Sequence, residues 1–348
     1  MTKKSRNIII GVSLVLLLLL IAGATLGGIF YQLVFRPQFH PSEKTYILID
    51  KDDNIDSIYN KVRQAGNPEH FWGFEWMADY KHYADNIHTG KYPIYPGDDA
   101  YHLLSRLLRG YQEPLNVTVG SVRTLDRLAG SLSKQLMIDS TDIVAYFEDT
   151  LLMQRLGYDK ATIPALIIPD TYEMYWDITA EQLMERLQKE HDMFWNESRK
   201  QQAQAIGPTP LEVTTLASIV EEETNNNEEK PMVAGLYMNR LRKHILLQAD
   251  PTVKFALQAF GRRRVLNSDL TIDSPYNTYL YPGLPPGPIR VPSKIGIEAV
   301  LNHAHHDYIF MCAKEDFSGT HNFAVTLAEH MRNARKYQQA LNERKIFR

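Results

Sequence analysis

The chain has 348 residues, of which 44% are hydrophobic and 10% aromatic, and its formal net charge is −3. This composition is typical of folded globular domains and excludes both a disordered chain and a chain that coats a polyanion, so no nucleic-acid partner is expected. The one cysteine, Cys312, excludes an intramolecular disulfide and any site built from several thiolates, and its apolar neighbours predict a small core residue.

The first part of the chain carries a long apolar segment. Three basic residues among the first six precede a run at residues 8–35 that contains no charged side chain and is long enough to cross a bilayer. Because the basic residues lie on its N-terminal side, the positive-inside rule predicts that residues 1–7 are cytoplasmic and that the rest is exported across the cell (inner) membrane to the periplasmic or extracytoplasmic side. A cleaved signal peptide is the alternative, since the small residues at 22–24 resemble a cleavage site. The continuation of the run to Phe35 favours an uncleaved, single-pass anchor.

Two exported domains are expected after this segment. A linker at residues 36–45 leads to an apolar run at 46–49 that predicts a strand, and an amphipathic helix is expected at 100–108. The turn residues Glu113 and Pro114 mark a boundary. The sequence therefore predicts a small α+β domain at 46–113 and a larger domain at 114–348.

The larger domain mixes strands and helices. Its pattern predicts a strand at 115–119, helices at 179–200, 209–224, 228–243 and 250–261, and a hairpin that joins 308–313 to 321–324. The expected fold class is therefore α+β: an N-terminal transmembrane helix, a small α+β domain and a larger mixed α/β domain.

The helix expected at 209–224 carries the main catalytic candidate. Thr209, Pro210 and Glu212 have the spacing of a helix start, with a capping box and a proline in the first turn. At about 100° per residue, Glu223 falls on the same apolar stripe as Leu216, whereas its two acidic neighbours point elsewhere. Burial of a carboxyl raises its pKa toward the range that a general acid needs.

Two alternatives to a catalytic Glu223 follow from the same pattern. The stripe can emerge into solvent where the helix frays, or the carboxylate can pair with Arg240 or Arg242. Periodicity by itself does not distinguish these readings.

A loop region rich in proline, glycine and polar aromatic residues follows. Residues 274–279 and 283–289 offer fixed backbone, stacking faces, amides and hydroxyls, which suit a polar polymer such as a glycan, although any proline-rich connection would look similar.

His321 can reach a cleft from the predicted hairpin, or it can be structural. The histidines at 303, 305 and 306 lack the spacing of zinc-peptidase ligands. No metal and no cofactor is expected.

Several blocks of sequence resemble one family. In family order they are Pro169-Asp170-Thr171-Tyr172, Ala217 to Thr224, Asn239-Arg240-Leu241, Leu247 to Val253, Tyr276-Asn277-Thr278-Tyr279, Gly283 to Ile289 and His321-Asn322-Phe323. Together they resemble the YceG-like endolytic murein transglycosylases. The resemblance implies one membrane anchor, a small LysM-like region and a catalytic domain. This chain departs from the family pattern by an extra acid, Glu222, inside the Glu-x-Glu pair and by Ile167-Ile168 where aromatic residues are common.

The resemblance also implies the site. The catalytic glutamate of the family is the second of the Glu-x-Glu pair, which corresponds to Glu223. The candidate substrate-binding residues, all of which lie within these blocks, are Glu221, Asn239, Gln248, Asp250, Tyr276, Asn277, Thr278, Tyr279 and His321.

The expected activity is non-hydrolytic cleavage of the bond between N-acetylmuramic acid and N-acetylglucosamine in nascent peptidoglycan strands, which leaves 1,6-anhydro ends and limits strand elongation. A single carboxylate suffices for this chemistry, whereas a glycoside hydrolase needs two. The alternatives are a hydrolase, with Glu221 or Asp250 as second carboxylate, and a non-catalytic cell-wall scaffold. The expected partners are peptidoglycan strands, the lipid bilayer through residues 8–35, and proteins of cell-wall synthesis.

Overall fold

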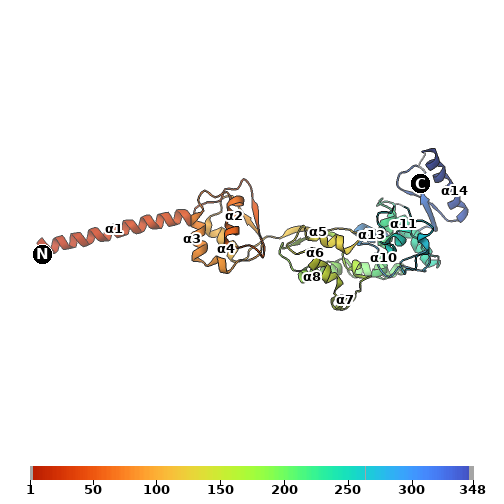
Figure 1. The fold of residues 1–348 in the computed structure, drawn as a ribbon, viewed down its shortest axis with the longest axis horizontal. Coiled ribbons are helices and arrows are strands. Elements are labelled where there is room, and N and C mark those ends of the chain that lie inside the picture. The colour runs from red at the N-terminus through yellow and green to blue at the C-terminus, as the bar shows by residue number, and fades with distance from the viewer. Residues whose placement is uncertain (1–2, 263, 345–348) are drawn as a thin grey trace. The chain divides into compact units, whose positions relative to one another are not determined.

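The computed structural model describes residues 3–262 and 264–344, so the outermost residues of the first and last expected segments lie outside it. The chain divides into two compact units. The first unit runs to Asn116 and also includes Glu173–Asp177. The second unit comprises Val117–Tyr172 and the chain from Ile178 onward. Helix and sheet are mixed in the chain, with helix predominant (Figure 1).

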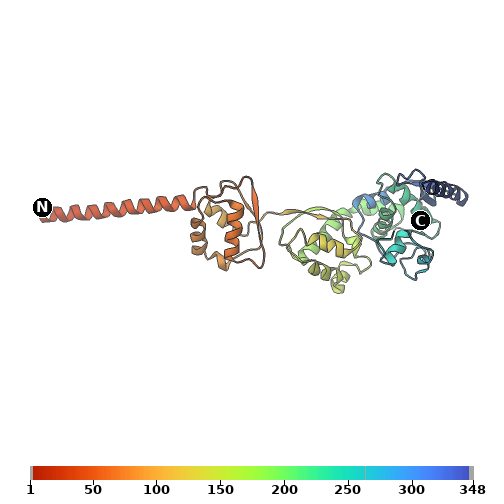
Figure 2. The same ribbon diagram turned by 45° about the horizontal axis from the view of Figure 1, so that its top comes forward.

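The first unit begins with a long apolar helix. Its elements are α1 (Lys3–Val34), β1 (Thr45–Ile49), α2 (Ile55–Gly66), α3 (Trp72–Tyr80), the 3₁₀ turn η1 (Tyr83–Asp85), β2 (Gly90–Ile94) and α4 (Ala100–Leu108). Among the described residues, α1 is the one helix long and apolar enough to cross a membrane. Figures 1 and 2 show it as the extended red helix in the N-terminal part of the chain.

A two-stranded antiparallel sheet and three helices form the rest of the first unit. β1 pairs with β2 in a register that sets Ile47 opposite Tyr92. Period-2 alternation explains why Ile47 and Ile49 are buried whereas Leu48 is exposed. The side chains of Asn54 and Asp99 accept hydrogen bonds from backbone amides and so fix the starts of α2 and α4.

The second unit contains the remaining elements. They are α5 (Leu125–Leu132), α6 (Ser140–Glu148), α7 (Thr150–Leu156), η2 (Ile163–Leu166), α8 (Ala180–Phe194), α9 (Glu197–Ile206), α10 (Pro210–Glu223), α11 (Lys230–Arg242), α12 (Asp250–Ala256), η3 (Asp269–Thr271), α13 (Lys294–Leu301), β5 (Phe310–Ala313), β6 (His321–Ala324) and α14 (Leu327–Glu343). The paired strands β3 (Leu115–Val119) and β4 (Asp170–Met174) carry the chain from one unit to the other.

Helix α10 forms the centre of the second unit. Thr209 and Glu212 close the capping box that the sequence predicts, with Pro210 in the first turn. Every residue from Val213 to Val220 is buried, because α9, α11, α12 and α13 surround the helix. The prediction of this helix is confirmed, as is that of the next one, α11.

Two of the predicted helices differ from the structure. The helix expected at 179–200 ends at Phe194, and the side chain of Asn196 caps a new helix, α9, by accepting a hydrogen bond from the amide of Arg199. The helix expected to reach Gly261 ends at Ala256, and Gln258 shortly after it has a φ of 53°. The break before α9 has a local cause. An asparagine side chain that accepts a hydrogen bond from the backbone amide three residues ahead favours a new helix start over continuation of the preceding helix.

Candidate functional site

Glu223 lies at the last residue of α10 and faces a cavity of about 260 Å³ in the second unit. The wall of this cavity comes from α10, α11, the turn before α12, the loop that contains Tyr279, and the hairpin β5–β6. Its residues are Glu223, Leu236, Tyr237, Arg240, Leu247, Gln248, Asp250, Tyr279, Met311, Cys312, Ala313 and His321.

The two acids before Glu223 are held by cations outside this cavity. Glu221 accepts a hydrogen bond from Ser293 Oγ at 2.8 Å and pairs with Lys230 Nζ at 3.1 Å. Glu222 accepts two hydrogen bonds from the guanidinium of Arg123, at 2.7 and 2.8 Å, and one from Arg290 at 2.8 Å. The rotation of about 100° per helical residue sends the three consecutive carboxylates in three directions.

Glu223 has a different kind of partner. Its Oε1 accepts a hydrogen bond of 2.6 Å from the neutral hydroxyl of Tyr237 on α11. Arg240 donates to the backbone oxygens of Ile309, Leu246 and Leu247, and Arg242 donates to Asn239. Neither arginine forms an ion pair with Glu223 among the described residues, so the structural role suggested by that pairing does not apply.

The surroundings of Glu223 favour its protonated form. Burial raises the pKa of Glu223 to about 6, and the nearby charge of Asp250 adds to the effect. The hydrogen bond from Tyr237 and the charges of His321 and Lys254 act in the opposite direction and limit the rise. Burial also raises the pKa of Tyr237 well above its ordinary value, so its hydroxyl remains a donor. The carboxyl can therefore both give and accept a proton near neutral pH.

Four of the other predicted residues line the same cavity as Glu223. Tyr279 donates a hydrogen bond of 2.6 Å from its hydroxyl to Asp250, and Arg240 donates one of 3.1 Å to Gln248 Oε1. His321 is fixed by Glu229, whose two carboxylate oxygens lie 2.6 Å from its backbone nitrogen and 3.0 Å from its ring Nδ1. Acidic, amide, hydroxyl and imidazole groups thus surround the space next to Glu223.

The remaining predicted residues do not line the cavity. Glu221 is held by Lys230 and Ser293, as described above. Asn239 donates to the backbone oxygens of His306 and Tyr308, and Asn277 donates to those of Leu270 and Ile272. Thr278 is buried and accepts from the amide of Ala249, and Tyr276 packs against Phe255 with ring centroids 4.6 Å apart. A buried amide or hydroxyl needs a partner, and here the backbone of neighbouring loops provides it.

Sequence reasoning did not assign Tyr237, Arg240 and Cys312 to the site, although all three line the cavity. The sequence does not distinguish Tyr237 from the other residues of its helix. Its position 14 residues after Glu223, on the next helix, indicates a contact with Glu223 only once α10 and α11 are known to pack against each other. The sequence suggests Arg240 only as an ion-pair partner of Glu223. Cys312 was expected in the core, but it is half-buried and lines the cavity from β5, so that expectation is wrong.

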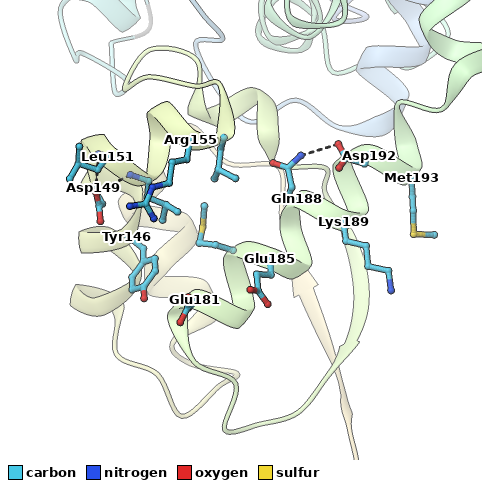
Figure 3. Close-up of a pocket in the computed structure, with 13 residues that line it drawn as sticks. Tyr146, Asp149, Leu151, Arg155, Glu181, Glu185, Gln188, Lys189, Asp192 and Met193 are labelled. Atoms are coloured by element: carbon cyan, nitrogen blue, oxygen red, sulfur yellow. Dashed lines mark hydrogen bonds between the residues drawn. The ribbon is translucent and has the colours of Figure 1, made fainter.

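A larger hollow of about 890 Å³ lies elsewhere in the second unit, between α7 and α8 (Figure 3). Its wall includes apolar side chains such as Leu151 and Met193, and charged ones such as Arg155 and Glu185. Glu223 is not among its lining residues. Within the described part of the chain, no group of histidine, cysteine and acidic side chains is arranged to hold a metal ion.

Comparison with known proteins gives concordant matches. The model of the YceG-like family matches residues 47–336. An endolytic murein transglycosylase of Bacillus subtilis is 28% identical over 345 residues, which cover 94% of this chain and 93% of the relative. An endolytic murein transglycosylase of Streptococcus pneumoniae is 26% identical over 93% of this chain, which spans 64% of that relative. The crystal structure of a YceG-like protein from Listeria monocytogenes matches with a TM-score of 0.54 and 25% identity, over 83% of this chain and 99% of that one.

Proposed function

Because the chain belongs to the YceG-like family, we propose that it is an endolytic murein transglycosylase, a lyase that cuts the glycan strands of peptidoglycan. Its similarity to the Bacillus subtilis enzyme over nearly the full length of both chains supports the assignment. The observation that carries the mechanism is the setting of Glu223: a carboxyl in a polar cavity, with a raised pKa and a phenol as its hydrogen-bond partner.

In the proposed reaction, Glu223 acts first as an acid and then as a base. The protonated carboxyl gives its proton to the glycosidic oxygen between N-acetylmuramic acid and N-acetylglucosamine, and the bond from the muramic anomeric carbon to this oxygen breaks. The carboxylate then takes the proton of the muramic C6 hydroxyl as its oxygen attacks the anomeric carbon. A 1,6-anhydro ring forms, the carboxyl is protonated again, and no water is consumed.

Two features, one of the substrate and one of the cavity, support a mechanism with a single acid/base in place of two carboxylates. The nucleophile belongs to the same sugar ring as the anomeric carbon, so proximity replaces activation of a separate water molecule. Glu221 is held away from the cavity by Lys230 and Ser293, which leaves Asp250 as the other carboxylate in its wall. A hydrolase that used Asp250 would leave reducing ends, which product analysis distinguishes.

The glycan contacts are assigned to the residues that share the cavity with Glu223. Gln248, Asp250, Tyr279 and His321 orient the sugar rings next to the scissile bond. Thr278 and Asn277 act indirectly: the carbonyl of Thr278 accepts from the amide of Gln248 at 3.0 Å, and Asn277 holds the preceding loop.

The digestion of purified murein tests the catalytic role. Glu223→Gln is expected to lower the rate of release of 1,6-anhydro products by about 100-fold or more, because the variant can no longer transfer a proton. Glu212→Gln is the matched control, since it lies on the same helix and glutamine also completes a capping box. Undiminished digestion by Glu223→Gln would overturn the assignment, and reducing ends in the wild-type products would show a hydrolase.

The apolar helix α1 and the charges beside it support a placement in the cell. We propose that α1 spans the cell membrane with the N-terminus in the cytoplasm, so that the rest of the first unit and the second unit lie outside. The exposure of the large apolar side chains of α1 supports the span, and the basic residues before the apolar run support the orientation. The first unit, with two helices between its two paired strands, is assigned as the LysM-like domain.

A further inference from the structure

Helix α3 in the first unit exposes aromatic residues on the side that normally carries charge. Trp72, Trp76 and Tyr80 follow one another at intervals of four residues, and 53%, 44% and 66% of their surfaces are exposed. The opposite side of the helix is buried in the core through Phe74 and Met77. A helix on a water-soluble surface usually carries polar side chains there, and a large exposed apolar patch indicates a binding surface.

The aromatic side of α3 is continuous with the end of α1. Trp76 stacks on Tyr80 with centroids 5.5 Å apart, and its other edge meets Phe30 of α1 at 5.5 Å. A Cβ added at Gly73 would collide with the backbone oxygen of Leu33, so the two helices approach as closely as a glycine allows. The two helices are therefore packed directly against each other.

Residues of α4 extend the same row of rings. Phe30 contacts Phe35 just after α1 at 6.0 Å, and Phe35 contacts Tyr101 of α4 at 5.4 Å. Tyr101 is 39% exposed. Three helices thus contribute rings to a single surface around the outer end of the apolar helix.

The length of the apolar segment sets the depth of this surface. At about 1.5 Å per residue, residues 8–35 extend about 42 Å, whereas the hydrocarbon core is about 30 Å thick. The basic residues before residue 8 hold that end at the cytoplasmic surface. The excess length therefore places Phe30 and Phe35, with the rings packed on them, in the outer headgroup region.

We propose that Trp72, Trp76, Tyr80 and Tyr101 form a lipid-binding surface that seats the first unit in the headgroup region of the membrane. The inference rests on the proposed anchoring by α1. Indole and phenol rings prefer this region because they are apolar in body and polar at one edge. Glu75 on the same helix is paired with Arg63, and Lys81 lies 5.6 Å from the centre of the Tyr80 ring, which suits contact with lipid phosphates.

Quenching of tryptophan fluorescence by brominated lipids tests the proposal. The full chain is reconstituted into nanodiscs of phosphatidylethanolamine and phosphatidylglycerol, with or without bromine on the upper acyl carbons. Trp72→Gln/Trp76→Gln removes two of the four tryptophans and is expected to lower the quenched fraction at least about twofold, because these two lie at the interface. The control, Trp176→Phe, removes a tryptophan elsewhere and is expected to leave the bromine-quenched signal in place.

The outcomes separate the lipid surface from the anchor and from the enzymatic activity. Equal quenched fractions in wild type and in the double variant, with the chain still in membranes after alkaline carbonate extraction, would refute the lipid surface but keep the anchor. Release of the wild-type chain by carbonate would refute both. Murein digestion is measured separately and does not depend on either result. Trp72→Gln alone gives the same comparison if the double variant does not fold.

Discussion

Three consecutive glutamates end helix α10, and the charge of their partners gives them different properties. Glu221 is paired with a lysine, and Glu222 is paired with two arginines. Glu223 faces a neutral phenol in a desolvated position, which leaves its proton affinity high. The capacity for proton transfer therefore belongs to Glu223.

The rate of murein cleavage should depend on pH through Glu223. The pKa of Glu223 is raised to about 6, and the first step needs the protonated form, so kcat/KM is expected to fall about tenfold per unit as pH rises above about 6. Initial rates between pH 5 and 8 measure this limb. Tyr237→Phe removes a hydrogen-bond donor that stabilises the carboxylate of Glu223. In this variant the fall in kcat/KM is therefore expected at higher pH than in the wild type. A limb at lower pH in this variant would contradict the assigned hydrogen bond.

Ionisation of the same residue should lower the free energy of unfolding as the pH rises from 4.5 to about 6. Because the pKa of Glu223 rises from 4.5 to about 6 on folding, the folded state binds its proton more tightly than the unfolded state does, and stability falls between these two pH values. The loss amounts to about 2 kcal/mol. Urea denaturation is expected to show Glu223→Gln more stable than wild type by about this amount at pH 8, with a smaller difference at pH 4.5. A difference that does not change with pH would contradict the raised pKa.

Among the elements, α10 was the easiest to predict because its signals are local. Thr209, Pro210 and Glu212 lie within four consecutive positions, and they alone define its start. Local chemistry of this kind does not depend on how the chain folds elsewhere. The stripe that the sequence predicts is too narrow, because every residue from Val213 to Val220 is buried.

The parts of the site that the sequence missed depend on contacts between distant segments. Asn277 and Gln248 look alike as candidate ligands, since both offer an amide on a loop. Only the fold decides that Asn277 binds the carbonyl groups of Leu270 and Ile272 whereas Gln248 lines the cavity. In the same way, the apolar neighbours of Cys312 predict a core strand, but the hairpin β5–β6 places this residue in the cavity wall.

Close packing of α11 offers a test at the level of elements. A Cβ added at Gly235 would collide with the backbone oxygen of Ala304, which cannot rotate away. Gly235→Ala is therefore expected to lower the free energy of unfolding by about 1–3 kcal/mol. Gly130→Ala in α5 is the matched control, because nothing lies within 4 Å of its added Cβ, and it is expected to be neutral or stabilising by up to about 1 kcal/mol. Equal effects of the two changes on urea unfolding would argue against the packing of α11.

At the scale of the whole molecule, each unit has its own hydrophobic core, but their sequences are interleaved. Asp177 lies far along the chain and yet belongs to the first unit, where it accepts hydrogen bonds from Thr89 at 2.8 Å and from Gln112 at 2.9 Å. A fragment that ends at Asn116 would lack these bonds.

The whole chain carries one thiol, and the hairpin places it in the wall of the cavity that Glu223 faces. A maleimide dye can therefore attach at a single position, and burial, which raises the pKa of the Cys312 thiol, should make attachment slow at neutral pH. Glycan strands added to Glu223→Gln, which is expected to bind without cutting, should slow labelling several-fold by covering the thiol. An unchanged rate would mean that glycan binds elsewhere. The natural sequence thus provides a built-in reporter of occupancy, since the labelling rate at increasing glycan concentrations would measure the bound fraction without an engineered probe site.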